Sequence, residues 1–179
     1  ARSAVLDAAR EERYPPLAAL LLTRLAEISP DAREQIEALD RAVASCPALP
    51  EPRWARFDAR ARAARIEEAL GDAQHLEAAA DGARARHEVC CRAARSLQQI
   101  GHLREAGKLF ERALRYLPDD PAATAGLARS LVETGQPERA FALLERAVAL
   151  GERAGRAEPD ALVDLARLVA DRLGDLPQG

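Results

Sequence analysis

His87, Cys90 and Cys91 are the residues whose types and spacing come closest to metal chemistry. They stand at positions i, i+3 and i+4 of an expected helix, so one helix face could bring three soft ligands near a single ion. A closed site needs a fourth ligand, and none is evident. Cys90 also falls in the apolar packing pattern of its helix. We therefore interpret Cys90 as a small core residue and expect no metal.

No constellation typical of catalysis accompanies these residues. His75 and His102 are isolated, and neither a Gly-x-Ser-x-Gly motif nor a phosphate-cradling glycine-rich loop occurs. The many carboxylates follow helical charge pairing instead. We therefore expect no catalytic residue, no cofactor and no enzymatic activity.

The composition indicates helices packed on helices. Hydrophobic residues make up 48% of the chain, mostly Ala and Leu, and aromatic residues only 3%. Ala, Leu, Arg and Glu lose little on entering a helix, whereas the residues that favour strands are sparse. The formal charge of −3 arises from interspersed acids and bases, which argues against nucleic-acid binding. The sequence predicts an all-α protein without a sheet.

The surroundings of the protein are indicated by its cysteines and its apolar runs. Three cysteines, two of them adjacent, do not suggest a disulfide framework, so we expect a reducing compartment, the cytoplasm. The longest apolar run, 17–22, is too short to cross a bilayer, and we expect no membrane insertion.

A single lysine, Lys108, with no Asn or Met, indicates a GC-rich bacterial genome. Because residue 1 is Ala1 and not Met, we expect a piece of a longer protein.

An internal repeat is the strongest signal in the chain. Residues 104–114 recur at 138–148, an offset of 34 residues. The recurring positions hold a small, a large and a small residue: Ala106, Phe110 and Ala113 in the first copy, and Ala140, Leu144 and Ala147 in the second. This pattern resembles the tetratricopeptide repeat, in which two antiparallel helices cross where side chains are small. The resemblance implies stacked helix pairs that form a solenoid with a concave inner face.

The resemblance predicts a single array over 1–179. Its parts are a repeat-like pair over 16–50, a degenerate pair over 51–86, a clear repeat over 87–120, a repeat with an extended second helix over 121–158, and a terminal helix over 159–173. The extended helix is expected to run from near Pro137 to about Arg153, because four extra residues are about one helical turn. In the degenerate pair we expect helices over 52–70 and 72–80, broken at Gly71.

The resemblance also implies which residues line the concave groove. The residue after the small crossing residue is an arginine in the three clearer copies, Arg95, Arg129 and Arg167, and in the two vaguer ones it would be Arg24 and Arg65. Such an arginine ladder would suit an acidic or C-terminal-carboxylate ligand. The alternative is solvated arginines, with Arg129–Glu133 and Arg167–Asp171 spaced for intrahelical ion pairs. The predicted partner site comprises Arg95, Arg129, Arg167, Glu88, Gln98, Gln99 and Glu133.

These patterns favour a protein-interaction adaptor or assembly factor that holds a peptide or a partner helix, with an acidic partner under the ladder hypothesis. Two alternatives stay open. The chain could be a self-associating structural scaffold, a homo-oligomer joined through exposed solenoid ends. It could also be the sensor segment of a larger regulator or enzyme.

Overall fold

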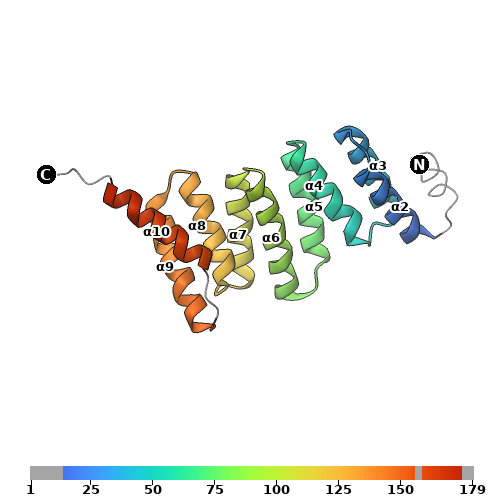
Figure 1. The fold of residues 1–179 in the computed structure, drawn as a ribbon. Helices are drawn as coiled ribbons and strands as arrows, with labels where there is room; N and C mark the ends of the chain where they lie inside the picture. Colours follow the sequence, from blue (N-terminus) through green and yellow to red (C-terminus); the bar gives the residue numbers. More distant parts are fainter. Residues whose placement is uncertain (1–13, 156–158, 175–179) are drawn as a thin grey trace. The chain divides into compact units, whose positions relative to one another are not determined.

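The computed structural model describes residues 14–155 and 159–174, with side chains as far as residue 170. Within these residues it contains nine helices and no strand, which confirms the all-α prediction (Figure 1). The helices are α2 (Pro15–Glu27), α3 (Ala32–Ser45), α4 (Pro50–Arg62), α5 (Ile66–Ala79), α6 (Gly82–Gln99), α7 (Leu103–Tyr116), α8 (Pro121–Glu133), α9 (Pro137–Arg153) and α10 (Pro159–Gly174). They belong to two compact units, residues 1–79 and 80–179. The single array over 1–179 stays a prediction.

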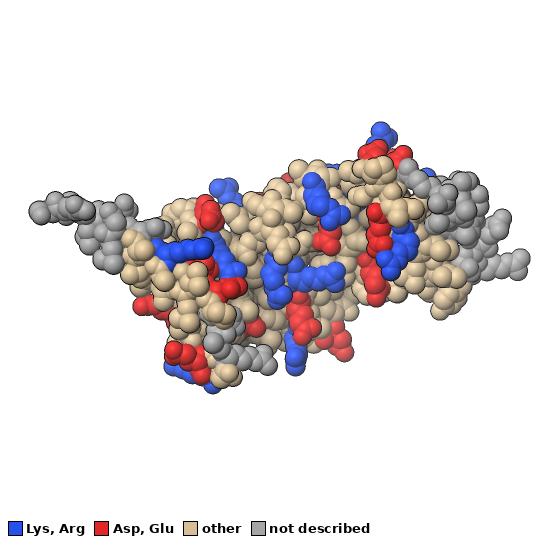
Figure 2. Space-filling view, in the orientation of Figure 1, with Lys and Arg blue, Asp and Glu red and all other residues tan. Residues whose placement is uncertain are grey.

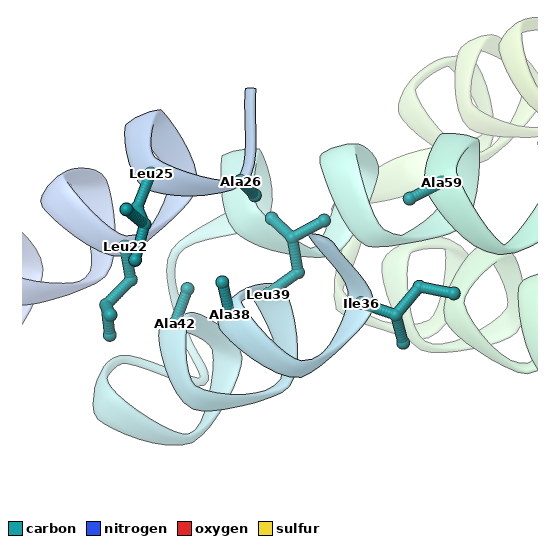
Figure 3. Packing of buried hydrophobic residues seen from close by; sticks show 8 residues of the cluster. All are labelled: Leu22, Leu25, Ala26, Ile36, Ala38, Leu39, Ala42 and Ala59. Carbon is teal, nitrogen blue, oxygen red and sulfur yellow. The ribbon is translucent and has the colours of Figure 1, made fainter. Parts of the chain in front are cut away.

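Unit 1 consists of two helix pairs, α2 with α3 and α4 with α5. Asp31 caps α3 by accepting a hydrogen bond from the Arg33 backbone N–H at 2.9 Å. The two pairs share an apolar core that contains Leu22 of α2, Leu39 of α3 and Ala59 of α4 (Figure 3). Small residues such as Ala59 let the helices approach closely. The larger leucines fill the space around these close contacts.

The second pair breaks at a different place from the predicted one. Residues 63–65 separate α4 from α5, so the helix expected over 52–70 is wrong, and Gly71 lies inside α5. Ala64 adopts φ 57° in this turn. That left-handed conformation costs a non-glycine residue roughly 1–2 kcal/mol, and no glycine or proline marks the position.

The turn after α4 nevertheless closes like the turns after α6 and α8. In each, a backbone N–H just past the helix donates to the carbonyl five residues earlier at 2.9 Å, the closure of a Schellman motif: Arg65 to Arg60, His102 to Leu97, and Gln136 to Leu131. Gly101 and Gly135 supply the left-handed residue in the last two. Ala64 therefore corresponds to Gly101, and the break expected at Gly71 lies at Ala64 instead.

Unit 2 contains two helix pairs, α6 with α7 and α8 with α9, followed by α10, which packs on α9 and α8. The four alanines at the predicted helix crossings, Ala94, Ala106, Ala128 and Ala140, are completely buried. The expected extra turn is also present, since α9 runs from Pro137 to Arg153. Completely buried small residues thus lie on both helices of each pair in this unit, where they allow close packing.

None of the helices that the structure describes combines the length and the apolar character required to cross a bilayer.

Candidate functional site

A groove of about 510 Å³ opens on unit 2. All five helices of the unit contribute to it. α6 and α7 contribute through their adjoining ends, α8 and α10 through three residues each, and α9 through Leu144. The lining residues are Gln98, Gln99, Gly101, Leu103, Arg129, Val132, Glu133, Leu144, Asp164, Arg167 and Leu168. Leu144 and Leu168 are buried, and Leu103 and Val132 are half-buried. The groove therefore combines apolar surface with a small number of charged groups, as binding sites do.

Two contacts between helices fix the walls of the groove. The Gln98 side-chain amide donates hydrogen bonds to the Gly126 carbonyl at 3.1 Å and to Ser130 Oγ at 3.3 Å, which ties α6 to α8. Gly126 leaves space for the buried ring of Phe110, because a Cβ at this position would lie within 2.8 Å of three ring carbons. Tight packing of α7 on α8 therefore depends on a residue without a side chain.

Arg129 is neutralised by the last helix. Its Nε lies 2.5 Å from Asp164 Oδ2, and its Nη2 lies 3.5 Å from Asp160 Oδ2. The predicted intrahelical pair with Glu133 is therefore wrong, since the carboxylates of α10 take that place. Figure 2 shows the same mixing more widely, with Lys and Arg beside Asp and Glu over the face in view. Among the described side chains, Arg167 and Glu133 form no ion pair, so they keep their charges available at the groove.

Five of the seven predicted partner-site residues line this one groove: Gln98, Gln99, Arg129, Glu133 and Arg167. The other two do not. Glu88 forms an ion pair with Arg84 on the same helix at 3.2 Å, and Arg95 interacts with the Cys91 thiol. Asp171, the expected partner of Arg167, lies outside the described side chains.

Sequence reasoning missed Asp164 and the leucines that supply the apolar lining. Asp164 stands 35 residues after Arg129, about one repeat. A search for opposite charges one repeat apart would have found this pair.

The two vaguer members of the predicted ladder lie in unit 1 and have local partners. Arg24 pairs with Glu27 at 2.6 Å, and Arg65 pairs with Glu68 at 2.6 Å. The hydrogen bond and the negative charge of Glu68 raise the pKa of Arg65. Arg65 lies in the turn between α4 and α5 and not on a first helix, so its expected groove position is wrong.

Unit 1 contains a buried ion cluster that explains why its second repeat looked degenerate. With Ala64 aligned to Gly101, the apolar packing positions Cys90, Ala93, Ala94 and Leu97 of α6 become Arg53, Arg56, Phe57 and Arg60 on α4. Three arginines thus occupy positions that a repeat of this kind fills with apolar residues. The pairing of α4 with α5 thus includes buried ion pairs beside apolar contacts.

Asp72 of α5 lies at the centre of this cluster, with its side chain only 2% exposed. Arg56 donates to both Asp72 oxygens, from Nε at 3.1 Å and from Nη2 at 2.5 Å, and Arg60 Nη1 donates at 2.9 Å. Both arginines also reach Asp40 of α3, at 2.8 and 3.0 Å. Burial alone would lower the pKa of Arg56, but the hydrogen bonds and charges of Asp72 and Asp40 raise it above its ordinary value.

His87 and Cys91 form a second polar contact inside unit 2. The ring of His87 is buried, with Nδ1 3.1 Å from the Ala113 carbonyl and Nε2 3.4 Å from both Cys91 Sγ and Asp120 Oδ2. Asp120 also caps α8 by accepting from the Ala123 N–H at 2.6 Å. Cys90 is completely buried, which confirms its interpretation as a core residue. The described residues contain no group of three that could hold a metal ion.

The Cys91 thiol gives a testable pH dependence. Burial, and then the charge of Asp120, raise the pKa of Cys91 from 9.0 to about 11. The protonated thiol therefore stabilises the folded state relative to the unfolded one. Because the folded pKa exceeds the unfolded one, this contribution is fully present below about pH 9 and is lost as the pH rises through 11. Between pH 8 and pH 10.5 we expect the free energy of unfolding to fall by on the order of 2 kcal/mol more in the wild type than in Cys91→Ala. Urea unfolding at the two pH values measures this difference. Equal losses in both proteins would contradict this assignment.

The paired helices define the class of the fold, a helix-pair repeat protein. Residues 97–157 match the family model for the tetratricopeptide repeat. This match confirms the resemblance to the tetratricopeptide repeat that was inferred from residues 104–114 and 138–148.

Solved structures support the same fold over most of the chain. A structure titled "Crystal structure of MamA" is 14% identical, with a TM-score of 0.60 over 86% of this chain and 88% of that one. PilW, titled a widely conserved type IV pilus biogenesis factor, is 16% identical, with a TM-score of 0.57 over 99% and 85% of the two chains. A chain of the Cut9–Hcn1 hetero-tetramer of APC/C is 11% identical, with a TM-score of 0.52 over 83% of this chain and 28% of that one. No curated protein sequence matches.

Proposed function

We propose that the groove of unit 2 binds a peptide segment or a helix of another protein, so that the chain acts as an adaptor or assembly factor. The observation that carries the proposal is the groove itself, in which the half-buried Leu103 and Val132 offer apolar surface beside the charged groups of Arg167 and Glu133. Its walls come from helices, so little order has to be gained on binding. The titles of PilW and of Cut9–Hcn1 refer to pilus biogenesis and to a protein complex, which is consistent with such a role for this fold.

The charges of the groove narrow the chemistry of the partner. Arg129 already faces Asp164 and Asp160, so it adds little net attraction for an acid. Arg167 remains for a partner carboxylate, since a guanidinium binds one in a bidentate geometry. The partner therefore presents an apolar side chain to Leu103 and Val132 and an acidic group to Arg167. This is a narrower site than a ladder of five arginines.

A displayed peptide library tests this proposal. Peptides selected on the wild type are measured by fluorescence polarisation against Arg167→Glu, Val132→Glu and a control, Arg153→Glu, whose exposed side chain lies outside the groove lining. We expect each groove variant to weaken binding at least about tenfold, a change of about 1.4 kcal/mol, and the control to leave it unchanged. Selected peptides that bind all three variants alike would place the binding site elsewhere.

We also propose that the protein works in the reducing environment of the cytoplasm. The three cysteines, Cys46, Cys90 and Cys91, form no disulfide with one another, which supports this placement.

A further inference from the structure

A small pocket lies between α7, α8 and the start of α9, with a volume of about 140 Å³. The buried part of its lining consists of Gly107, Leu127, Ser130 and Leu131. The pocket shares only Leu103 with the groove of unit 2, so it is a separate site. Binding in this pocket is therefore independent of what the groove binds.

Gly107 leaves this pocket open. In the repeat alignment the other second helices carry a large apolar residue at this position: Ile36 in α3, Leu70 in α5 and Phe141 in α9. A Cβ on Gly107 would lie 3.4 Å from Ser130 Cβ and 3.8 Å from Leu127 Cδ1, so a longer side chain would extend into the pocket. Because glycine destabilises a helix interior, helix formation does not account for the presence of Gly107.

Two cations of α7 belong to the exposed part of the lining. Arg104 and Lys108 stand one helical turn apart and form no ion pair within the described residues. Like charges at this spacing repel each other. In unit 1 the corresponding residues of α3, Arg33 and Glu37, neutralise each other at 3.0 Å. Departures from local rules that coincide in this way are typical of functional sites.

A third cation of the lining comes from α9. Arg139 Nη1 donates to Gln136 Oε1 at 2.6 Å, and this acceptor is uncharged, so the positive charge of the guanidinium is not neutralised. Glu111 is the one acid among the described lining residues. Three cations and one acid leave a net charge of +2 at the pocket. Such a charge favours an anion with two negative charges over a single carboxylate.

We propose that this pocket binds a phosphorylated serine or threonine side chain of a partner protein. A phosphate monoester carries a charge of about −1.5 to −2 at pH 7 and three acceptor oxygens. Arg104 can donate to two of these oxygens, and Lys108 adds a point charge. Sites for whole small molecules measure about 300–1,000 Å³, so a pocket of about 140 Å³ holds little more than the phosphoryl group. The rest of the ligand then lies outside the pocket, as a peptide chain would.

Titration with N-acetyl-phosphoserine N-methylamide, followed by two-dimensional NMR, tests the site with a minimal probe. We expect the amide signals of Gly107 and Ser130 to shift and to saturate with a Kd on the order of 1 mM. The double variant Arg104→Ser with Lys108→Ser should bind the probe at least about tenfold more weakly. Arg115→Ser removes an exposed cation of α7 outside the pocket and should bind like the wild type. Unchanged binding by the double variant, or no shift up to about 50 mM probe, would overturn the proposal.

Gly107→Leu tests whether the anion enters the pocket. This variant restores the large residue that the other second helices carry and keeps all three cations. We expect it to bind the probe at least about tenfold more weakly, because the leucine side chain occupies the space of the phosphoryl group. Circular dichroism checks that the variant is folded. Binding equal to the wild type would place the anion on the exposed cations only and contradict a pocket site.

Two comparisons test the chemistry and the source of the ligand. N-acetyl-aspartate N-methylamide carries a single negative charge and should bind at least about tenfold more weakly than the phosphoserine probe. Equal binding would assign the pocket to carboxylates. Lys108 is the only lysine, so its protection from acetylation, read by mass spectrometry, reports occupancy of this pocket. A peptide pool with one central phosphoserine should protect Lys108 at lower concentration than glycerol phosphate does. If the pool is no more effective, the ligand is a small phosphate ester and not a protein side chain.

Discussion

Replacing Asp72 by Asn is expected to destabilise unit 1 by about 3 kcal/mol or more. The side chain keeps its size but loses the charge that Arg56 and Arg60 face at 2.5 to 3.1 Å. Both guanidiniums have side chains only 13% exposed, so water cannot replace the missing carboxylate. Removing one partner of a buried ion pair costs roughly 3–5 kcal/mol, because the other charge remains desolvated. Trp54, the only tryptophan, lies on α4 and reports the unfolding of this unit by fluorescence.

Asp40→Asn is the matched control for this prediction. Asp40 accepts from the same two arginines, but its side chain is 45% exposed. Water can reach this position and replace the lost carboxylate, so we expect Asp40→Asn to lower the stability of unit 1 by about 1 kcal/mol or less. Joint replacement of Arg56, Arg60 and Asp72 by apolar residues should recover most of the loss, since an apolar cluster of similar volume often matches a buried ion cluster. Equal effects of Asp72→Asn and Asp40→Asn would show that the cluster is not desolvated.

Gly126→Ala is expected to destabilise unit 2 by about 2 kcal/mol, although alanine usually stabilises a helix by about 1 kcal/mol relative to glycine. The added Cβ would lie within 2.8 Å of three carbons of the Phe110 ring, which is 1% exposed and cannot move aside. α7 and α8 must then separate. The groove should lose peptide binding as well, since Val132 and Glu133 follow on α8. Thermal unfolding followed by circular dichroism measures the loss of stability.

Gly71→Ala is expected to change stability in the opposite direction. Gly71 lies inside α5, and a Cβ there meets nothing within 4 Å, so alanine should stabilise unit 1 by about 0.5–1 kcal/mol. A second test removes the obstacle. In a Phe110→Leu background, Gly126→Ala should cost clearly less than in the wild type, because the smaller side chain leaves room. An unchanged cost would show that the ring does not cause the effect.

The sequence alone was sufficient where the determining pattern is local. The small residues at Ala94, Ala106, Ala128 and Ala140 recur at helical spacing, and all four are buried at helix crossings. Four extra residues were enough to extend α9 to Arg153. Such features follow from the period of one helix and its turn, so they are visible before any helix finds a neighbour.

The candidate site was accessible from the sequence only in part. Repeat phase selected five residues that line one groove, including Gln98 and Arg129, because phase decides which way a helix residue points. Whether they bind a partner stays a prediction. It did not decide what Arg129 binds. Glu133 and Asp164 both have suitable charges, and only the position of α10 brings Asp164 to 2.5 Å.

In unit 2 the sequence by itself determined the helices, their pairing through small residues, and the face that each helix turns to its neighbours. Tertiary structure decided the break after α4 and the burial of Asp72, where Ala64 replaces a glycine and Arg56 and Arg60 replace apolar residues. The physical reason is the range of the interactions. Helix periodicity and turn chemistry act between residues close in sequence. The contribution of a charged side chain to stability depends instead on how completely helices distant in sequence shield it from water.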